Sequence, residues 1–268
     1  MQKILFPTDF SPAAHNAYRY AMALAKETGA IIELMHVYTI PFTGTDLYLD
    51  LSQQRELRVQ RQMQKEALMT AFVEQYDFNR LGDKLVYPGL FIEQEIIDRS
   101  GKGVDLIVMG TKGERNPLDK FLGSVTTQLM MNANCPVLAI PENATYEGIQ
   151  NIAYATTFGY KDQPFVEKLA EFAQELDAQI HFVHVSDDSK IAVEETLVMD
   201  NMPSNVVHLS VVNGETVMEG IDHFLDEHRV DILALYMQKR KLWERLFHSS
   251  FTRQMTFHTS TPLFVFHE

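Results

Sequence analysis

The chain is poor in cysteine and in basic residues, and both shortages limit what it can be. Cys135 is the single cysteine among 268 residues, so no disulfide forms within the chain, and the reducing cytoplasm is the expected compartment. The 23 Lys and Arg residues stand against 36 Asp and Glu, which gives a net charge of −13. Binding to nucleic acids and to membrane surfaces depends on clustered positive charge, so we expect neither.

Long apolar runs are missing too. No stretch approaches the roughly 20 residues that span a bilayer, and the segment Met1–Pro7 reaches a proline too soon for a secretory signal. The phosphate loop, the dinucleotide-binding glycine pattern, the nucleophile elbow and paired-cysteine metal sites are also absent. With 46% apolar residues, the chain instead has the composition of a globular protein with a substantial core.

What the chain does contain is an internal repeat. Ile4–Ser11 matches Ile152–Gly159 at an offset of 148 (152 − 4), and Val104–Ile107 matches Val230–Leu233 at an offset of 126 (230 − 104). The first copy therefore carries about 22 extra residues (148 − 126) in its middle. Self-similarity at a fixed offset indicates repeated structural units. We predict two domains, 1–145 and 146–268.

Each copy alternates strand and helix patterns. Strands as continuously apolar as Leu106–Met109 are typical of parallel sheets buried on both faces. The sequence thus predicts an α/β protein of two tandem, open, twisted, Rossmann-like parallel sheets, each with five strands and about four helices. In the first copy we expect strands at 2–7, 31–37, 84–88, 104–109 and 136–140, and helices at 12–28, 51–76, 90–99 and 124–133.

A glycine pattern follows the strand that ends near Met109. Gly110 and Gly113 come first, and nine residues later Gly123-Ser124 opens a helix. Glycine lets the main chain approach a ligand closely, and the free N–H groups of a helix start favour anions. The pattern therefore predicts a phosphate-binding site, to which Lys112 either adds charge or contributes nothing from solvent.

Two further segments end at the same edge of the predicted sheet, where open parallel sheets bind ligands. Asp9, after the first strand, offers a carboxylate to a ribose hydroxyl or an adenine amino group. Val37, ending the second strand, offers main-chain groups and an apolar wall to the base. The expected nucleotide-binding residues are Pro7, Thr8, Asp9, Val37, Met109, Gly110, Lys112, Gly113, Gly123, Ser124, Val125 and Thr126.

These residues resemble the nucleotide motif of the universal stress protein family, in its tandem two-domain form. The family spaces Gly, two residues, Gly, nine residues and Gly-Ser or Gly-Thr, as Gly110, Gly113, Gly123 and Ser124 do here. The resemblance implies a fold like that of the adenine-nucleotide α-hydrolases and a stress-response regulator that binds ATP, with or without Mg²⁺, in the first copy.

The second copy departs from the motif wherever it matters. Side chains replace the glycines, and a threonine replaces the aspartate: Thr157 stands for Asp9, Tyr236 for Gly110, Lys239 for Gly113 and Ser249 for Gly123. We expect this copy not to bind ATP in the same way and to serve as a structural or interaction module.

Two other functions stay open. The first is a nucleotide-independent interaction scaffold of the same fold, in which the glycines only form a turn and Ser124 only caps a helix. The second is an adenylating ligase, although Asp9–Pro12 lacks the Ser-Gly-Gly sequence that such an enzyme needs. No general base stands near a γ-phosphate, so we assign no catalytic residue and expect at most a slow ATPase.

The last strand of each copy, Pro136–Ile140 and Pro262–Phe266, is apolar. Such a strand would be prone to pair with another strand if it lay unpaired at the edge of a sheet. Single-domain members of the family dimerise through such strands, so we expect the two copies to pair with each other, as in a dimer. A further homodimer of the whole chain stays open.

Two smaller features carry weaker predictions. His181 and His208 are a candidate metal pair, although ordinary histidines are favoured, and no metal ligand is assigned. Segment 40–62 is a lid, a partner surface or, as favoured, the solvated face of a helix.

Overall fold

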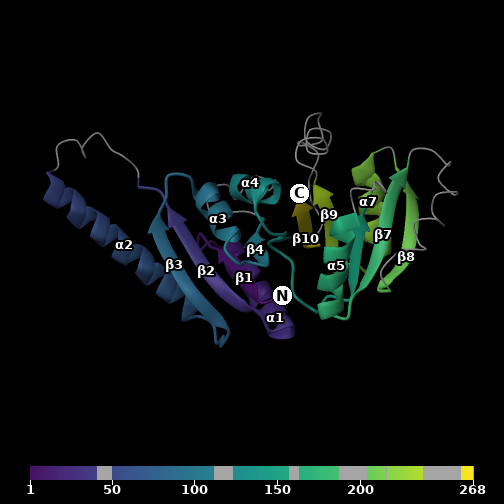
Figure 1. Ribbon diagram of the computed structural model, residues 1–268, viewed down its shortest axis with the longest axis horizontal. Coiled ribbons are helices and arrows are strands. Elements are labelled where there is room, and N and C mark those ends of the chain that lie inside the picture. The colour runs from purple at the N-terminus through teal and green to yellow at the C-terminus, as the bar shows by residue number, and fades with distance from the viewer. Residues whose placement is uncertain are drawn as a thin grey trace.

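The computed structural model describes residues 1–40, 50–111, 123–156, 163–186, 204–214, 216–237 and 261–267. Its ten strands form one sheet in the order β3-β2-β1-β4-β5-β10-β9-β6-β7-β8 (Figure 1). The strands of the first half are β1 (Lys3–Pro7), β2 (Ile31–Tyr38), β3 (Leu81–Pro88), β4 (Leu106–Gly110) and β5 (Val137–Ile140). Those of the second are β6 (Asn151–Ala155), β7 (Gln179–Ser186), β8 (Val206–Asn213), β9 (Ile232–Met237) and β10 (Leu263–His267).

The two halves have the same topology, which confirms the α/β fold of two tandem parallel sheets. They meet where β5 and β10 run antiparallel, and this junction is the one antiparallel pairing between described strands. Three residue pairs face each other across this junction: Val137 and Val265, Leu138 and Phe264, and Ala139 and Leu263. All of these side chains are buried.

Six described helices cover the sheet: α1 (Pro12–Thr28), α2 (Leu51–Val73), α3 (Ile92–Ser100), α4 (Ser124–Asn132), α5 (Gln163–Glu175) and α7 (Val217–Glu227). Side chains of α1, α2 and α5 share one core cluster with alternate strand residues. Side chains of α3, α4 and α7 belong to a second cluster. Because successive strand residues point to opposite faces, the two clusters lie on the two faces of the sheet. None of the described helices combines the length and apolar character needed to cross a membrane.

Local sequence signals place the first helix correctly. The Ser11 hydroxyl accepts a hydrogen bond from the Ala14 N–H at 3.2 Å, and Pro12 occupies the first helical position. Gly29 ends the helix in the left-handed region at φ +78°, where a side chain would be strained.

Two predicted elements needed correction. The strand expected at 84–88 begins three residues earlier, at Leu81, because it pairs with β2 through an irregular register that admits the exposed Asp83 and Lys84. The helix expected at 51–76 ends at Val73. Its start is fixed by Asp50, whose carboxylate accepts from the Gln53 N–H while the Gln53 side chain accepts from the Asp50 N–H.

Candidate functional site

The turn after β1 is held by hydrogen bonds between close neighbours. The Thr8 hydroxyl accepts from the Phe10 N–H at 3.0 Å, and the Asp9 carboxylate accepts from the Ser11 N–H at 3.0 Å. Phe10 adopts φ +65°, a left-handed conformation that is costly for a bulky residue. Asp9 itself is exposed, so its carboxylate stands at the mouth of the turn.

A buried histidine fastens this turn to β2. His36 Nδ1 lies 2.8 Å from the Thr8 carbonyl oxygen, and the Thr8 N–H donates to the Met35 carbonyl at 2.9 Å. The His36 ring packs against Phe10, with centroids 4.4 Å apart. Burial is the largest influence on the pKa of His36 and lowers it. The turn that carries Asp9 is therefore fastened to β2 by two hydrogen bonds between buried residues. The sequence motifs assign no role to His36, although a histidine within an apolar strand indicates a buried polar contact.

Hydrogen bonds join the end of β4 to the start of α4 at two positions of the glycine motif, Gly110 and Gly123. The Gly123 N–H donates to the Thr111 carbonyl at 2.7 Å, and the Thr126 hydroxyl donates to the Gly110 carbonyl at 3.1 Å. Helix α4 begins after Gly123 without a side-chain cap and without an acidic residue in its first turn. Among described residues, the start of α4 thus offers N–H groups that no side chain uses.

Each predicted site residue in the described part of the chain lies at or near the carboxyl end of a first-half strand or at the start of α4. Because β2, β1 and β4 are adjacent and parallel, these ends share one edge of the sheet. Pro7, Thr8, Val37, Met109 and Thr126 are buried, Gly110, Gly123 and Val125 are half-buried, and Asp9 and Ser124 are exposed. Lys112 and Gly113 lie outside the described residues. The hydroxyl of the buried Thr126 is bound to the Gly110 carbonyl, so Thr126 ties the start of α4 to the end of β4.

Helix α2 closes the outer side of this edge. Gln62 accepts a hydrogen bond from the Tyr38 hydroxyl at 2.8 Å and donates to the Val86 carbonyl at 2.7 Å. The Lys65 ammonium lies 5.9 Å from the centre of the Tyr38 ring. Of the segment 40–62, residues 51–62 are thus helical, whereas 41–49 lie outside the described residues.

The second half keeps the hydrogen bond that fastens the turn but has a large side chain at a position of the glycine motif. His184 Nδ1 lies 2.9 Å from the Thr156 carbonyl, at positions offset by 148 from His36 and Thr8. Where the first half has Gly110, Tyr236 lays its ring on Phe165 of α5, with centroids 3.5 Å apart and planes 20° from parallel. Thr157, Lys239 and Ser249, the other departures from the motif, lie outside the described residues.

A family model decides the relationship, because the universal stress protein model matches residues 1–141, more than half of the chain. The chain belongs to the universal stress protein family. A universal stress protein of Thermus aquaticus is 30% identical over 138 residues, which cover 51% of this chain and 96% of that protein. The protein MJ0531 of Methanocaldococcus jannaschii is 29% identical over 152 residues, covering 52% of this chain and 81% of its own length.

A solved universal stress protein from Archaeoglobus fulgidus resembles the whole chain. Its TM-score is 0.69 at 17% identity, and the match covers 98% of this chain and 97% of that one. At this identity the likeness supports the fold and nothing finer, but it extends the family fold over both halves of this universal stress protein.

The other candidate residues do not form a metal site. His181 and His208 are direct neighbours on β7 and β8, with ring centroids 5.6 Å apart. Within the described part of the chain, however, no three His, Cys, Asp or Glu side chains are grouped so that they hold an ion. Cys135 is buried, and burial raises the pKa of its thiol to about 12, as expected for a core residue.

Proposed function

We propose that this universal stress protein is a stress-response regulator that binds ATP in its first half, residues 1–145. The observation that carries the proposal is the uncapped start of α4 at Gly123, close to Gly110 on the edge where Asp9 is exposed. Phosphates bind well at such a helix start, because its free N–H groups and dipole favour negative charge. Asp9 then accepts hydrogen bonds from the nucleoside.

We further propose that the second half, residues 146–268, does not bind nucleotide and acts as a structural or interaction module that completes a dimer-like pair. Tyr236 supports this assignment, since its buried ring occupies the position of Gly110 and stacks on Phe165. Antiparallel pairing of β5 with β10 supports the dimer-like arrangement.

Mg²⁺ would enter with the triphosphate. Ser124, which is exposed at the start of α4, fits a hard cation, because its hydroxyl is an oxygen ligand of the kind that Mg²⁺ prefers. Bound Mg²⁺ would neutralise phosphate charge. Asp9 lies at the nucleoside end, and no described residue beside α4 is poised as a general base, so any hydrolysis of ATP is expected to be slow.

Thermal unfolding with ATP, with AMP and without ligand tests the proposal. ATP should raise the melting temperature, because a ligand that binds only the folded state stabilises it by mass action. Gly123→Val should abolish that rise, since its side chain crowds the main-chain cradle, whereas Ser124→Ala should keep most of it. The rise on adding ligand is compared within each variant, because Gly123→Val also weakens the helix cap by about 1 kcal/mol.

Calorimetric titration fixes the number of sites. One ATP per chain supports the proposal, and two equivalent sites contradict the role given to the second half. A chain that responds to no nucleotide would instead be an interaction scaffold of the same fold.

A further inference from the structure

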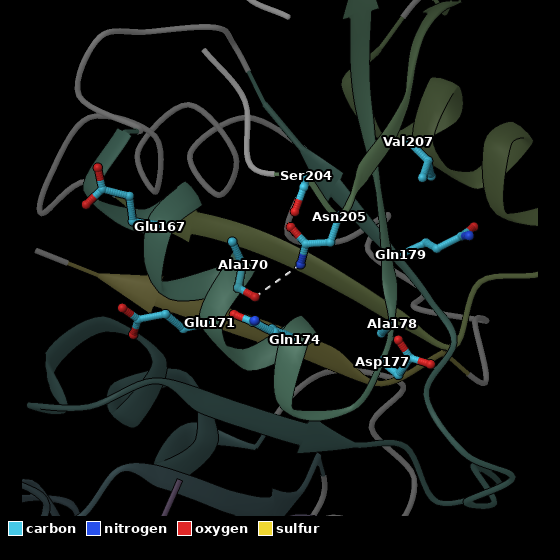
Figure 2. A pocket seen from close by; sticks show the side chains of 10 residues that line it. All are labelled: Glu167, Ala170, Glu171, Gln174, Asp177, Ala178, Gln179, Ser204, Asn205 and Val207. Carbon is cyan, nitrogen blue, oxygen red and sulfur yellow. Dashed lines mark hydrogen bonds between the residues drawn. The ribbon is translucent and has the colours of Figure 1, made fainter.

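The second half carries an open acidic groove. It lies between α5 and the first residues of β7 and β8 (Figure 2). Glu167, Glu171 and Asp177 line it with exposed carboxylates, and Asn205 on its far wall donates to the Ala170 carbonyl at 3.1 Å. Among the described residues that line it, none is Lys or Arg.

The first half carries a projecting helix that is basic, opposite in charge to the groove. The N-terminal part of α2 reaches past the ends of β2 and β3 (Figure 1). Four basic and two acidic residues fall within 51–66, in a chain whose net charge is −13. Arg55 and Arg58 are exposed, and the hydrogen bonds described between α2 and the sheet begin at Gln62.

This projecting part of α2 also exposes apolar side chains. Leu51 is 73% exposed, Val59 58% and Met63 63%. Large exposed side chains on one helix mark an interaction surface more often than isolated ones do. Leu51, Arg55 and Arg58 are spaced four and three residues apart, so they form one stripe along the helix. Glu167 and Glu171, four residues apart on α5, form a stripe of matching spacing and opposite charge.

The helix and the groove of one chain cannot meet. Helix α2 packs on β3, the outer strand of the first half, and seven strands separate β3 from β7. At about 4.8 Å between strands, the distance is on the order of 40 Å. A partner for either surface must therefore come from another molecule, and each copy of the chain supplies both surfaces.

We propose that residues 51–65 of one chain dock into the Glu167–Glu171–Asp177 groove of a second copy. The contact is heterologous, because different surfaces meet, so repeating it builds open chains of molecules unless the rotation closes a ring. About 15 residues of helix give a contact roughly 22 Å long. An interface of this size, held by exposed charges, is weak and sensitive to salt.

Sedimentation velocity over a range of protein concentrations tests the proposal. The unmodified chain should associate increasingly with concentration at low salt and return to monomer at high salt. Arg55→Glu with Arg58→Glu should remove this association, and so should Glu167→Lys with Glu171→Lys. Lys26→Glu with Lys102→Glu reverses two exposed cations elsewhere, changes the net charge by as much as the two Arg→Glu substitutions do, and should leave association intact.

Mixing the two charge-reversed proteins gives the decisive measurement. In the mixture, the reversed helix of one variant faces the reversed groove of the other, so association should return although each variant alone stays monomeric. Circular dichroism establishes that every variant is folded. A wild-type chain that stays monomeric at all concentrations overturns the proposal. So does association that survives both reversals, or a mixture that remains monomeric.

Discussion

The ring of His36 is bound to the main-chain carbonyl of Thr8, 2.8 Å from its Nδ1 atom. A carbonyl only accepts hydrogen bonds, so Nδ1 carries the proton of the neutral ring. The other ring nitrogen, Nε2, is buried and has no hydrogen-bond partner within the described residues. His36 therefore holds the Asp9 turn in place as a neutral donor, and protonation of the ring would leave the new N–H at Nε2 buried without a partner among the described residues.

Removing this donor should weaken both stability and nucleotide binding. His36→Leu leaves the Thr8 carbonyl without its partner, and loss of one such hydrogen bond costs about 0.5–1.5 kcal/mol. His36→Asn keeps an N–H donor close to the ring position and should retain more of both properties. Urea unfolding and calorimetric titration with ATP measure the two effects. Equal behaviour of the Leu and Asn variants would show that the hydrogen bond is unimportant.

Acid should destabilise the protein partly through this residue. Burial lowers the pKa of His36 below its ordinary value of 6.5, so the folded chain resists a proton that the unfolded chain accepts. Stability contributed by neutral His36 is therefore present above pH 6.5 and is lost as the pH falls below it, by at most about 1.4 kcal/mol per pH unit.

Urea midpoints at pH 7.5 and pH 5.5 measure this loss. The difference between them should be smaller in His36→Asn than in the unmodified protein. The pKa values of His15 and His181 are also lowered by burial, so part of the difference should remain in the variant. An unchanged difference would contradict the role given to His36.

Breaking the ion pair between α3 and β2 should be costly. Arg99 binds both carboxylate oxygens of Glu33, which is 2% exposed, and Lys3 lies 3.8 Å from one of them. Arg99→Met leaves a buried carboxylate poorly paired, and the expected loss is about 3–5 kcal/mol. Adding Glu33→Leu should recover most of the loss, because the stranded charge is gone. Denaturant unfolding of both single variants and the double variant measures the coupling.

Truncating Tyr236, which stands in the second half where the first half has Gly110, should not create a nucleotide site. Tyr236→Ala removes a buried ring that stacks on Phe165, and losses of about 3–5 kcal/mol are usual for large aromatic side chains. The chain should still bind one ATP, since Lys239 and Ser249 also depart from the motif. A second equivalent site in this variant would show that Tyr236 alone blocks binding.

Local signals in the sequence were enough for most of the fold. Capping at Ser11 and Gly29 is decided by neighbouring residues, and the repeat gave both halves one topology. The start of β3 was missed because Gly82 and Asp83 interrupt the apolar pattern, and only pairing with β2 makes these residues part of the strand.

The site was predicted less completely, because its supporting contacts join distant parts of the chain. His36 meets Thr8 across 28 residues and, away from the site, Glu33 meets Arg99 across 66. Neither spacing follows a helical or strand period, so no local pattern reveals the pair. The glycine positions, by contrast, were visible at once, since Gly110 and Gly123 flank a strand end and a helix start that the sequence marks clearly.

Reversal of strand direction at the β5–β10 junction places the carboxyl ends of the two sets of strands on opposite rims of the sheet. The rim on which first-half strands finish is the rim on which second-half strands begin. The turns after β1 and β6, alike in their Thr–His bonds, therefore open on opposite rims. A ligand bound beside Asp9 would not contact the rim near Tyr236. It would therefore affect a partner bound at that rim only through the sheet that the two halves share.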